Sequence, residues 1–214
     1  PAGFTKEWLA DFAAGLKADQ DRFAISLLGG DTSRGEIISI AVTAFGFVPA
    51  GKMVKRSGAR AGDAVYVTGS IGDSGGGLAI FRREKHSLSE QERDYLIGCY
   101  RVPQPPLAFG AALRDLANAS VDISDGLIAD LGHIASASGV HIAVEAEHVP
   151  RSAPLRALWG DSAESILRAA TAGDDYQIAF TADAAREDQI RAVAGNVAIT
   201  RIGTVRAGEG VELI

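Results

Sequence analysis

Three groups of acidic side chains in this 214-residue sequence each follow an apolar run typical of a strand. The groups are Asp31, the pair Asp122 and Asp125 on either side of Ser124, and the pair Asp174 and Asp175. Ligands of α/β proteins gather at strand ends, so we expect these carboxylates to meet there. Two carboxylates 4 Å apart repel by about 1 kcal/mol in water and about 4 kcal/mol at an effective dielectric constant of 20. A bound cation removes that repulsion, and an all-oxygen ligand set favours Mg²⁺.

Each acidic group also has an ordinary structural interpretation. Asp and Ser between a strand and a helix are common N-cap residues, so Ser124 or Asp125 could simply satisfy backbone N–H groups. Asp31 beside glycines is typical of a turn, and Asp174–Asp175 of a loop that leaves a helix. Asp122 differs, because it is expected inside a strand, where aspartate is disfavoured and needs a partner.

Other motifs are less specific. The segment 69–77 is rich in glycine, but it lacks the Gly-Lys-Ser/Thr end of a Walker A motif and does not spell Gly-x-Gly-x-x-Gly. We expect it to form a close strand-to-helix turn, with phosphate contact as a secondary role. Arg34 and Arg56 are candidate phosphate ligands, because a guanidinium donates two parallel hydrogen bonds to an anion. The histidines show no metal-ligand spacing and no serine lies in a nucleophile elbow, which disfavours zinc enzymes and hydrolases.

The elements that must position these residues are predicted from periodicity. Residues 5–22 carry apolar side chains at helical spacing, and Thr5 is a candidate N-cap. Runs of β-branched and aromatic residues predict strands at 23–28, 37–48, 64–68, 120–124, 140–149, 175–181 and 197–205. Further helices are predicted at 78–81, 90–101, 107–117, 126–138, 162–171 and 183–194, the second of them with a Ser89–Glu92 capping box. The alternation beyond residue 50 predicts an α/β layer fold, with a domain boundary at Pro49-Ala-Gly51.

Composition narrows the classes of function. The chain has 27 acidic and 21 basic residues and a net charge of −6, so it lacks the basic footprint of nucleic-acid or anionic-lipid binding. No apolar run approaches the ~20 residues that a membrane span needs, and the N-terminus shows no signal pattern. The single cysteine, Cys99, cannot form an internal disulfide and is expected as a thiol buried in a helix. We expect a cytoplasmic protein with neither nucleic-acid nor membrane partners.

Several motifs occur together in the order and at the spacing of a known family. The most specific are the turn Leu28-Gly-Gly-Asp-Thr-Ser-Arg-Gly35 and the strand end Ile123-Ser-Asp-Gly-Leu127. Shorter motifs lie at Gly46–Pro49, Arg56–Ala59, Tyr66–Gly69, Gly72–Ser74, Asp130–His133 and Gly173–Tyr176. Together they cover nearly the whole chain and resemble the thiamine-monophosphate kinase family of the aminoimidazole-ribonucleotide-synthetase-like superfamily.

This resemblance implies a fold, an activity and a site. Residues 1–49 would be the C-terminal part of an α/β N-terminal domain that binds ATP and dimerises, and 50–214 a C-terminal α/β domain. The implied activity is Mg²⁺-dependent transfer of the γ-phosphate of ATP to thiamine monophosphate, giving thiamine diphosphate and ADP, in a homodimer. The implied ATP-binding residues are Gly30, Asp31, Arg56 and Ser124, the metal ligands are Asp31, Asp122 and Asp125, and the substrate-binding residue is Asp174.

The sequence departs from the family pattern in two respects. Members usually read Gly-Gly-Glu-Asp-Tyr-Glu where this chain reads Ala172-Gly-Asp-Asp-Tyr-Gln177, so Asp174 is one methylene shorter than the usual glutamate. Members also carry an earlier Gly-Asp-Asp stretch and a later substrate-packing aromatic, which this sequence lacks. Because the chain begins at Pro1 and its only methionine is Met53, we expect a truncated chain that holds part of the metal site.

Two alternative functions remain open at this stage. The chain could belong to another ATP-dependent synthetase or kinase of the same superfamily, such as one of purine or selenophosphate metabolism. It could also be a non-catalytic remnant or interaction module that binds little or nothing. The Gly-Gly-Asp-Thr-x-Arg-Gly turn, associated with the thiamine branch, favours the kinase.

Overall fold

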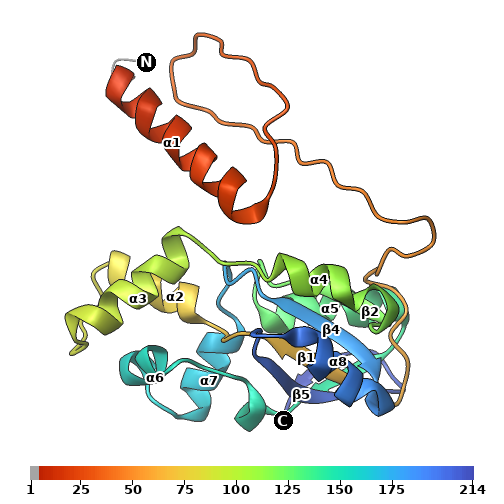
Figure 1. Cartoon of the computed structure of the whole chain (residues 1–214). Helices are drawn as coiled ribbons and strands as arrows, with labels where there is room; N and C mark the ends of the chain where they lie inside the picture. The colour runs from red at the N-terminus through yellow and green to blue at the C-terminus, as the bar shows by residue number, and fades with distance from the viewer. Residues whose placement is uncertain (1–4) are drawn as a thin grey trace. The chain divides into compact units, whose positions relative to one another are not determined.

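The computed structural model describes residues 5–214, and these divide into two compact units, one ending at Val48 and one spanning Pro49–Ile214 (Figure 1). The first unit begins with helix α1, Lys6–Phe23. Thr5 caps this helix as predicted, because its hydroxyl accepts a hydrogen bond from the backbone N–H of Trp8.

The strands predicted at 23–28 and 37–48 are wrong: α1 extends through residue 23, and residues 25–48 contain no strand. Their apolar side chains are exposed, among them Leu28, Val42, Phe45 and Phe47. Local β propensity describes how a side chain fits a sheet, but a strand exists only when another strand pairs with it. The described residues of this unit provide no sheet to pair with, and an isolated hairpin is marginal in water.

The second unit is built on one six-stranded sheet. Its strands are β1 Asp63–Thr68, β2 Ala119–Asp122, β3 His141–Val144, β4 Ile178–Asp183, β5 Ile199–Arg206 and β6 Gly210–Leu213. They lie in the order β2-β4-β1-β5-β3-β6, and all neighbours are antiparallel except the parallel pair β3 and β6. The central strand β1 is buried along its whole length.

Helices cover both faces of the sheet. They are α2 Asp73–Phe81, α3 Glu90–Arg101, α4 Leu107–Ala112, α5 Leu127–Ser138, α6 Ala153–Trp159, α7 Ala163–Ala170 and α8 Glu187–Ala194, with short 3₁₀ turns at Leu113–Asp115, Ala146–His148 and Ala184–Arg186. Alternate residues of β1 serve the two faces, as the period of a strand requires. Val65 and Val67 pack with α5, whereas Ala64 and Tyr66 pack with α4 and α8. The predicted α/β architecture is confirmed for this unit.

Several local predictions are confirmed, and others need correction. Ser89 and Glu92 form the capping box of α3, and Gly139 ends α5 in the left-handed conformation. Helix α2 begins at Asp73, so the glycines at 75–77 lie inside a helix rather than in a loop. Tertiary packing overrides their low helix propensity, because a Cβ at Gly77 would lie 2.1 Å from the Leu96 carbonyl oxygen of α3. Helix α6 and strand β6 were not predicted.

Two features of the helices bear on the class of protein. None of the helices within residues 5–214 is both long and apolar enough to cross a membrane. Cys99 lies half-buried in α3, and this burial raises the pKa of its thiol to about 11. A thiol with so high a pKa stays protonated at neutral pH and is a poor nucleophile.

Candidate active site

The connection from β2 to α5 is a tight turn over Ser124–Gly126, held from inside by Asp130 of α5. One carboxylate oxygen of Asp130, Oδ2, accepts the backbone N–H groups of Ser124 at 2.9 Å, Asp125 at 3.0 Å and Gly126 at 3.2 Å. Asp130 is only 2% exposed. A buried carboxylate that satisfies three N–H groups fixes the backbone of the turn and therefore the directions of the side chains it carries.

This arrangement replaces the N-cap interpretation of Ser124 and Asp125. Gly126 is the N-cap residue of α5, and no side-chain oxygen caps the helix. Asp122 was expected inside its strand, but it is the last residue of β2 and is exposed. The carboxylates of Asp122 and Asp125 form no hydrogen bond or ion pair with any residue from 5 to 214. They are therefore available to an external ligand.

The loop Gly173–Gln177, which leads into β4, lies directly against this turn. Backbone hydrogen bonds run from the Asp174 N–H to the Ser124 carbonyl at 2.9 Å and from the Tyr176 N–H to the Ile123 carbonyl at 2.8 Å. A Cβ at position 173 would lie 2.4 Å from the Ser124 carbonyl oxygen, so only glycine fits there. The structure thus joins two acidic groups that are 50 residues apart in the sequence.

The pKa of Tyr176 reflects the negative charge where the turn and the loop meet. Partial burial raises the pKa of its phenol, and the negative charges of Asp174, Asp122 and Asp125 raise it further. Its hydroxyl lies 3.4 Å from Oδ1 of Asp174. Three carboxylates that all act on one phenol form a negative cluster, and such a cluster is stabilised by a bound cation.

Asp175, the neighbour of Asp174, points into the protein instead. It is 6% exposed, and burial raises the pKa of its carboxyl to about 7. Its Oδ2 accepts the Gly72 N–H at 2.6 Å and its Oδ1 accepts the Ser74 N–H at 3.1 Å. Asp174 and Asp175 therefore have different roles, one open to solvent and one structural.

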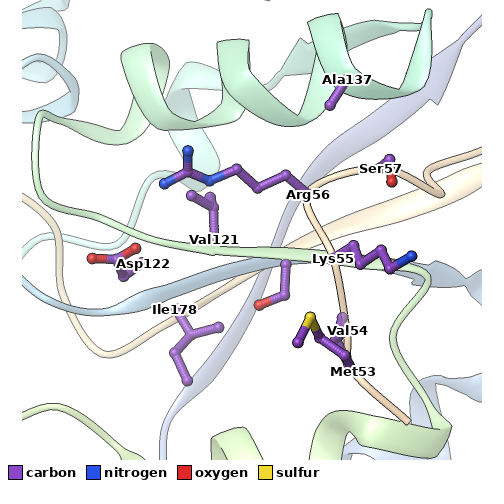
Figure 2. A pocket seen from close by; sticks show the side chains of 10 residues that line it. Met53, Val54, Lys55, Arg56, Ser57, Val121, Asp122, Ala137 and Ile178 are labelled. Atoms are coloured by element: carbon purple, nitrogen blue, oxygen red, sulfur yellow. The ribbon is translucent and has the colours of Figure 1, made fainter. Parts of the chain in front are cut away.

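Arg56 lies beside the cluster, in the segment that precedes β1. Its backbone carbonyl accepts the Ser138 hydroxyl of α5 at 3.3 Å, and the Lys55 carbonyl accepts the Ser120 N–H of β2 at 3.0 Å. These bonds hold the segment along an open groove of about 560 Å³ that Asp122 also lines. Figure 2 shows the Arg56 guanidinium extending along the groove toward the side of Asp122, while Lys55 points the other way.

A second, smaller cavity of about 280 Å³ is lined by Asp174 and by residues of α2 and α7. Arg168 stacks on the Trp159 ring at 4.1 Å and makes two 2.8 Å hydrogen bonds to the Glu84 carboxylate. Asp174 thus belongs to the carboxylate cluster and also lines a cavity that contains Trp159.

Some of the expected site residues lie outside the second unit, which carries the carboxylate cluster. Gly30 and Asp31 lie in the first unit, in a segment without regular secondary structure, as does Arg34. In the second unit the structure brings together Asp122, Ser124, Asp125 and Asp174, with Arg56 along the same groove.

Two candidates, Asp130 and Tyr176, did not follow from the sequence. Asp175 was expected to join the other carboxylates, but it is buried against Gly72 and Ser74 instead. Asp130 follows the turn by four residues, a helical spacing that could have indicated a carboxylate folding back onto N–H groups. Asp125, Asp130 and His133 also place ligand atoms within 4.8 Å of one another. Because Oδ2 of Asp130 already accepts three N–H groups, we do not assign a metal to this trio.

Comparisons with known proteins identify the class. The chain matches the family model for the AIR synthase related protein, N-terminal domain, over residues 1–48 and that for the C-terminal domain over residues 60–214. The chain therefore belongs to the AIR synthase related protein family.

The relatives narrow this class further. The chain is 38% identical over 211 residues to a thiamine-monophosphate kinase of Salmonella typhimurium, covering 97% of this chain and 64% of the relative. A crystal structure of thiamine-monophosphate kinase from Stenotrophomonas maltophilia K279a matches with a TM-score of 0.86 at 33% identity, over 98% of this chain and 68% of that one. A structure of AaThiL complexed with AMPPCP and TMP matches with a TM-score of 0.65 at 37% identity, over 75% and 50%.

Proposed function

We propose that the protein to which this chain belongs is a thiamine-monophosphate kinase, which transfers the γ-phosphate of ATP to thiamine monophosphate and releases ADP. One observation carries the proposal: the Asp174 and Tyr176 N–H groups bind the Ser124 and Ile123 carbonyls, which brings Asp174 to the turn that carries Asp125. No described residue neutralises the carboxylates of Asp122 and Asp125. The chain spans 64% of its Salmonella relative, so the activity is proposed for the full-length protein.

The open carboxylates fit a magnesium ion. Asp122 and Asp125 offer oxygen ligands without cysteine or histidine, which is the donor set that Mg²⁺ prefers. Asp31 of the first unit remains a candidate metal ligand on the strength of its motif alone. When bound, the ion neutralises charge on the phosphate oxygens during transfer.

The remaining residues would bind and align the two substrates. Arg56 would donate hydrogen bonds to a nucleotide phosphate, and Ser124 and Gly30 would contact ATP. Asp174 would contact the acceptor. The acceptor's phosphate oxygen forms a bond to the γ-phosphorus as the bond from that phosphorus to the ADP oxygen breaks, and no strong base is required because the acceptor is already anionic. Alignment and charge stabilisation then account for catalysis.

The assembly is part of the same proposal. Residues 1–49 would complete an N-terminal domain that pairs across a homodimer, and 50–214 would close over the nucleotide, in the cytoplasm. Asp174 keeps the negative charge of the usual glutamate. Its side chain is one methylene shorter, so its carboxylate would reach less far toward the acceptor.

Replacing Asp122 with Asn in the full-length protein tests the metal assignment. We expect kcat with Mg-ATP and thiamine monophosphate to fall about 100-fold or more, because the neutral amide no longer balances the cation. ADP release measured by a coupled assay gives the rate, and circular dichroism verifies the fold. Asp188→Asn makes the same change on the exposed start of α8 and should keep full activity. Near-normal turnover in Asp122→Asn would contradict the proposal.

A further inference from the structure

The glycine-rich start of α2 is a fixed anchor within the second unit. Asp73, its first residue, is 4% exposed and accepts three hydroxyl groups, from Ser70 at 2.7 Å, Tyr95 at 2.9 Å and Ser152 at 2.6 Å. These partners come from the turn before α2, from α3 and from the N-cap of α6. The backbone N–H groups around Asp73 are therefore held in place from three sides.

Asp175 joins the Gly173–Gln177 loop to this anchor. Each of its carboxylate oxygens accepts a different N–H group, Oδ2 that of Gly72 and Oδ1 that of Ser74. The contact spans about 100 residues of sequence and needs two acceptor oxygens at once. An amide of the same shape offers only one.

The loop held in this way is strained on both sides of Asp175. Asp174 has φ +67° and Tyr176 has φ +51°, the left-handed region that non-glycine residues rarely adopt. Such residues persist only where their surroundings fix them, and they concentrate at functional sites. On the opposite edge, the backbone hydrogen bonds to Ile123 and Ser124 complete the fixation.

We propose that Asp175 is a positioning residue for the acceptor: by tying the loop to the start of α2, it holds the Asp174 carboxylate where it meets the acceptor. This inference rests on the proposed function and deepens it. It also gives the glycine-rich segment a role other than phosphate binding, because its N–H groups bind a carboxylate of the protein itself. If Asp175 only capped α2, its replacement would lower stability but would not change the KM of one substrate more than that of the other.

The test is Asp175→Asn in the full-length protein, with the KM of each substrate measured separately. We expect the KM for thiamine monophosphate to rise at least tenfold while the KM for Mg-ATP changes less than twofold. Asp188→Asn makes the same change on the exposed start of α8 and is the matched control; it should leave both constants unchanged. Combined with Asp174→Asn, Asp175→Asn should add less than a twofold further change.

Several outcomes would overturn the inference. They are an unchanged acceptor KM, an equal rise of both constants, or a full additional effect in the Asp174→Asn background. If Asp175→Asn does not fold, Ser74→Pro provides a second test, because it removes one of the two N–H donors to Asp175. Position 74 is the second residue of α2, and Pro154 occupies the same position in α6. The KM for thiamine monophosphate should again rise while the KM for Mg-ATP stays nearly constant.

A separate measurement distinguishes this inference from the proposed function. If the wild-type protein phosphorylates no thiamine monophosphate, the function is wrong. The positioning role is then tested by amide hydrogen exchange, in which the Asp174 and Tyr176 N–H groups should exchange at least tenfold faster in Asp175→Asn than in wild type. Equal exchange would contradict the positioning role even in an active enzyme.

Discussion

The Ser124–Gly126 turn and the Gly173–Gln177 loop lie side by side, yet a buried aspartate holds each of them differently. Asp130 gathers three N–H groups of its own turn onto one oxygen, whereas Asp175 uses both oxygens to reach a distant helix. The first contact is local and the second is long-range. One site can therefore combine a turn that its own helix fixes with a loop that the rest of the fold must hold.

The backbone conformations show the same difference. In the turn the only positive φ belongs to Gly126, while the loop places Asp174 and Tyr176 in the left-handed region. Strain of this kind is stabilised by surrounding contacts and is released when they are lost. We therefore expect the loss of Asp130 to alter mainly stability, and the loss of Asp175 to alter mainly function.

The largest expected effect on stability comes from Asp130→Ala. Three N–H groups lose their acceptor, so the free energy of unfolding should fall by about 3 kcal/mol. Asp130→Asn should recover at least half of that loss, because a single amide oxygen can replace Oδ2. Urea unfolding of the full-length protein measures both values. Equal losses in the two variants would show that the charge, rather than the shared oxygen, holds the turn.

This comparison also shows what sequence can and cannot predict. Asp122, Asp125 and Asp174 could be proposed because they follow apolar runs and motifs, both of which are local. The roles of Asp130 and Asp175 depend on which N–H groups lie nearby after folding, and for Asp175 these are 100 residues away. The four-residue spacing of Asp130 from its turn is a local signal, but no local pattern gives the partners of Asp175.

The fold was predictable to a similar extent. The capping box at Ser89 and the C-terminal glycine of α5 depend on only a few adjacent residues, and both predictions are confirmed. The strands predicted at 23–28 and 37–48 fail because pairing requires another strand, which β propensity does not encode. The early start of α2 was missed because its glycines are favoured by contact with α3 rather than by helix propensity.

A second effect concerns the pH dependence of stability, and it comes from Asp175 in the loop. Burial raises the pKa of Asp175 from 3.8 to about 7; the N–H groups of Gly72 and Ser74 oppose this shift, and the charge of Asp73 adds to it. Between these pH values the folded state keeps a proton that the unfolded state has lost. The stabilisation is therefore complete below pH 3.8 and disappears as the pH rises through about 7.

We expect this proton to contribute a fall of about 3 kcal/mol in unfolding free energy between pH 4 and pH 7. The Asp175→Asn variant, which cannot ionise, should lack that part of the slope. Asp188→Asn, on the exposed start of α8, should keep it. Urea unfolding at a series of pH values measures the three slopes, and identical slopes in wild type and Asp175→Asn would contradict the burial of this carboxyl.

The smallest expected effect tests the strain directly, by comparing alanine and glycine at matched positions. At Tyr176, where φ is +51°, Tyr176→Gly should be about 1 kcal/mol more stable than Tyr176→Ala, because only glycine accepts the left-handed conformation without a Cβ penalty. At Ser124, where φ is not positive, Ser124→Ala should be the more stable of the corresponding pair, since glycine loses more entropy on folding. Thermal unfolding of the four variants gives both differences. If the alanine variant were the more stable one at both positions, the loop would be no more strained than the turn. The backbone conformation would then give no reason for Asp130 and Asp175 to act differently.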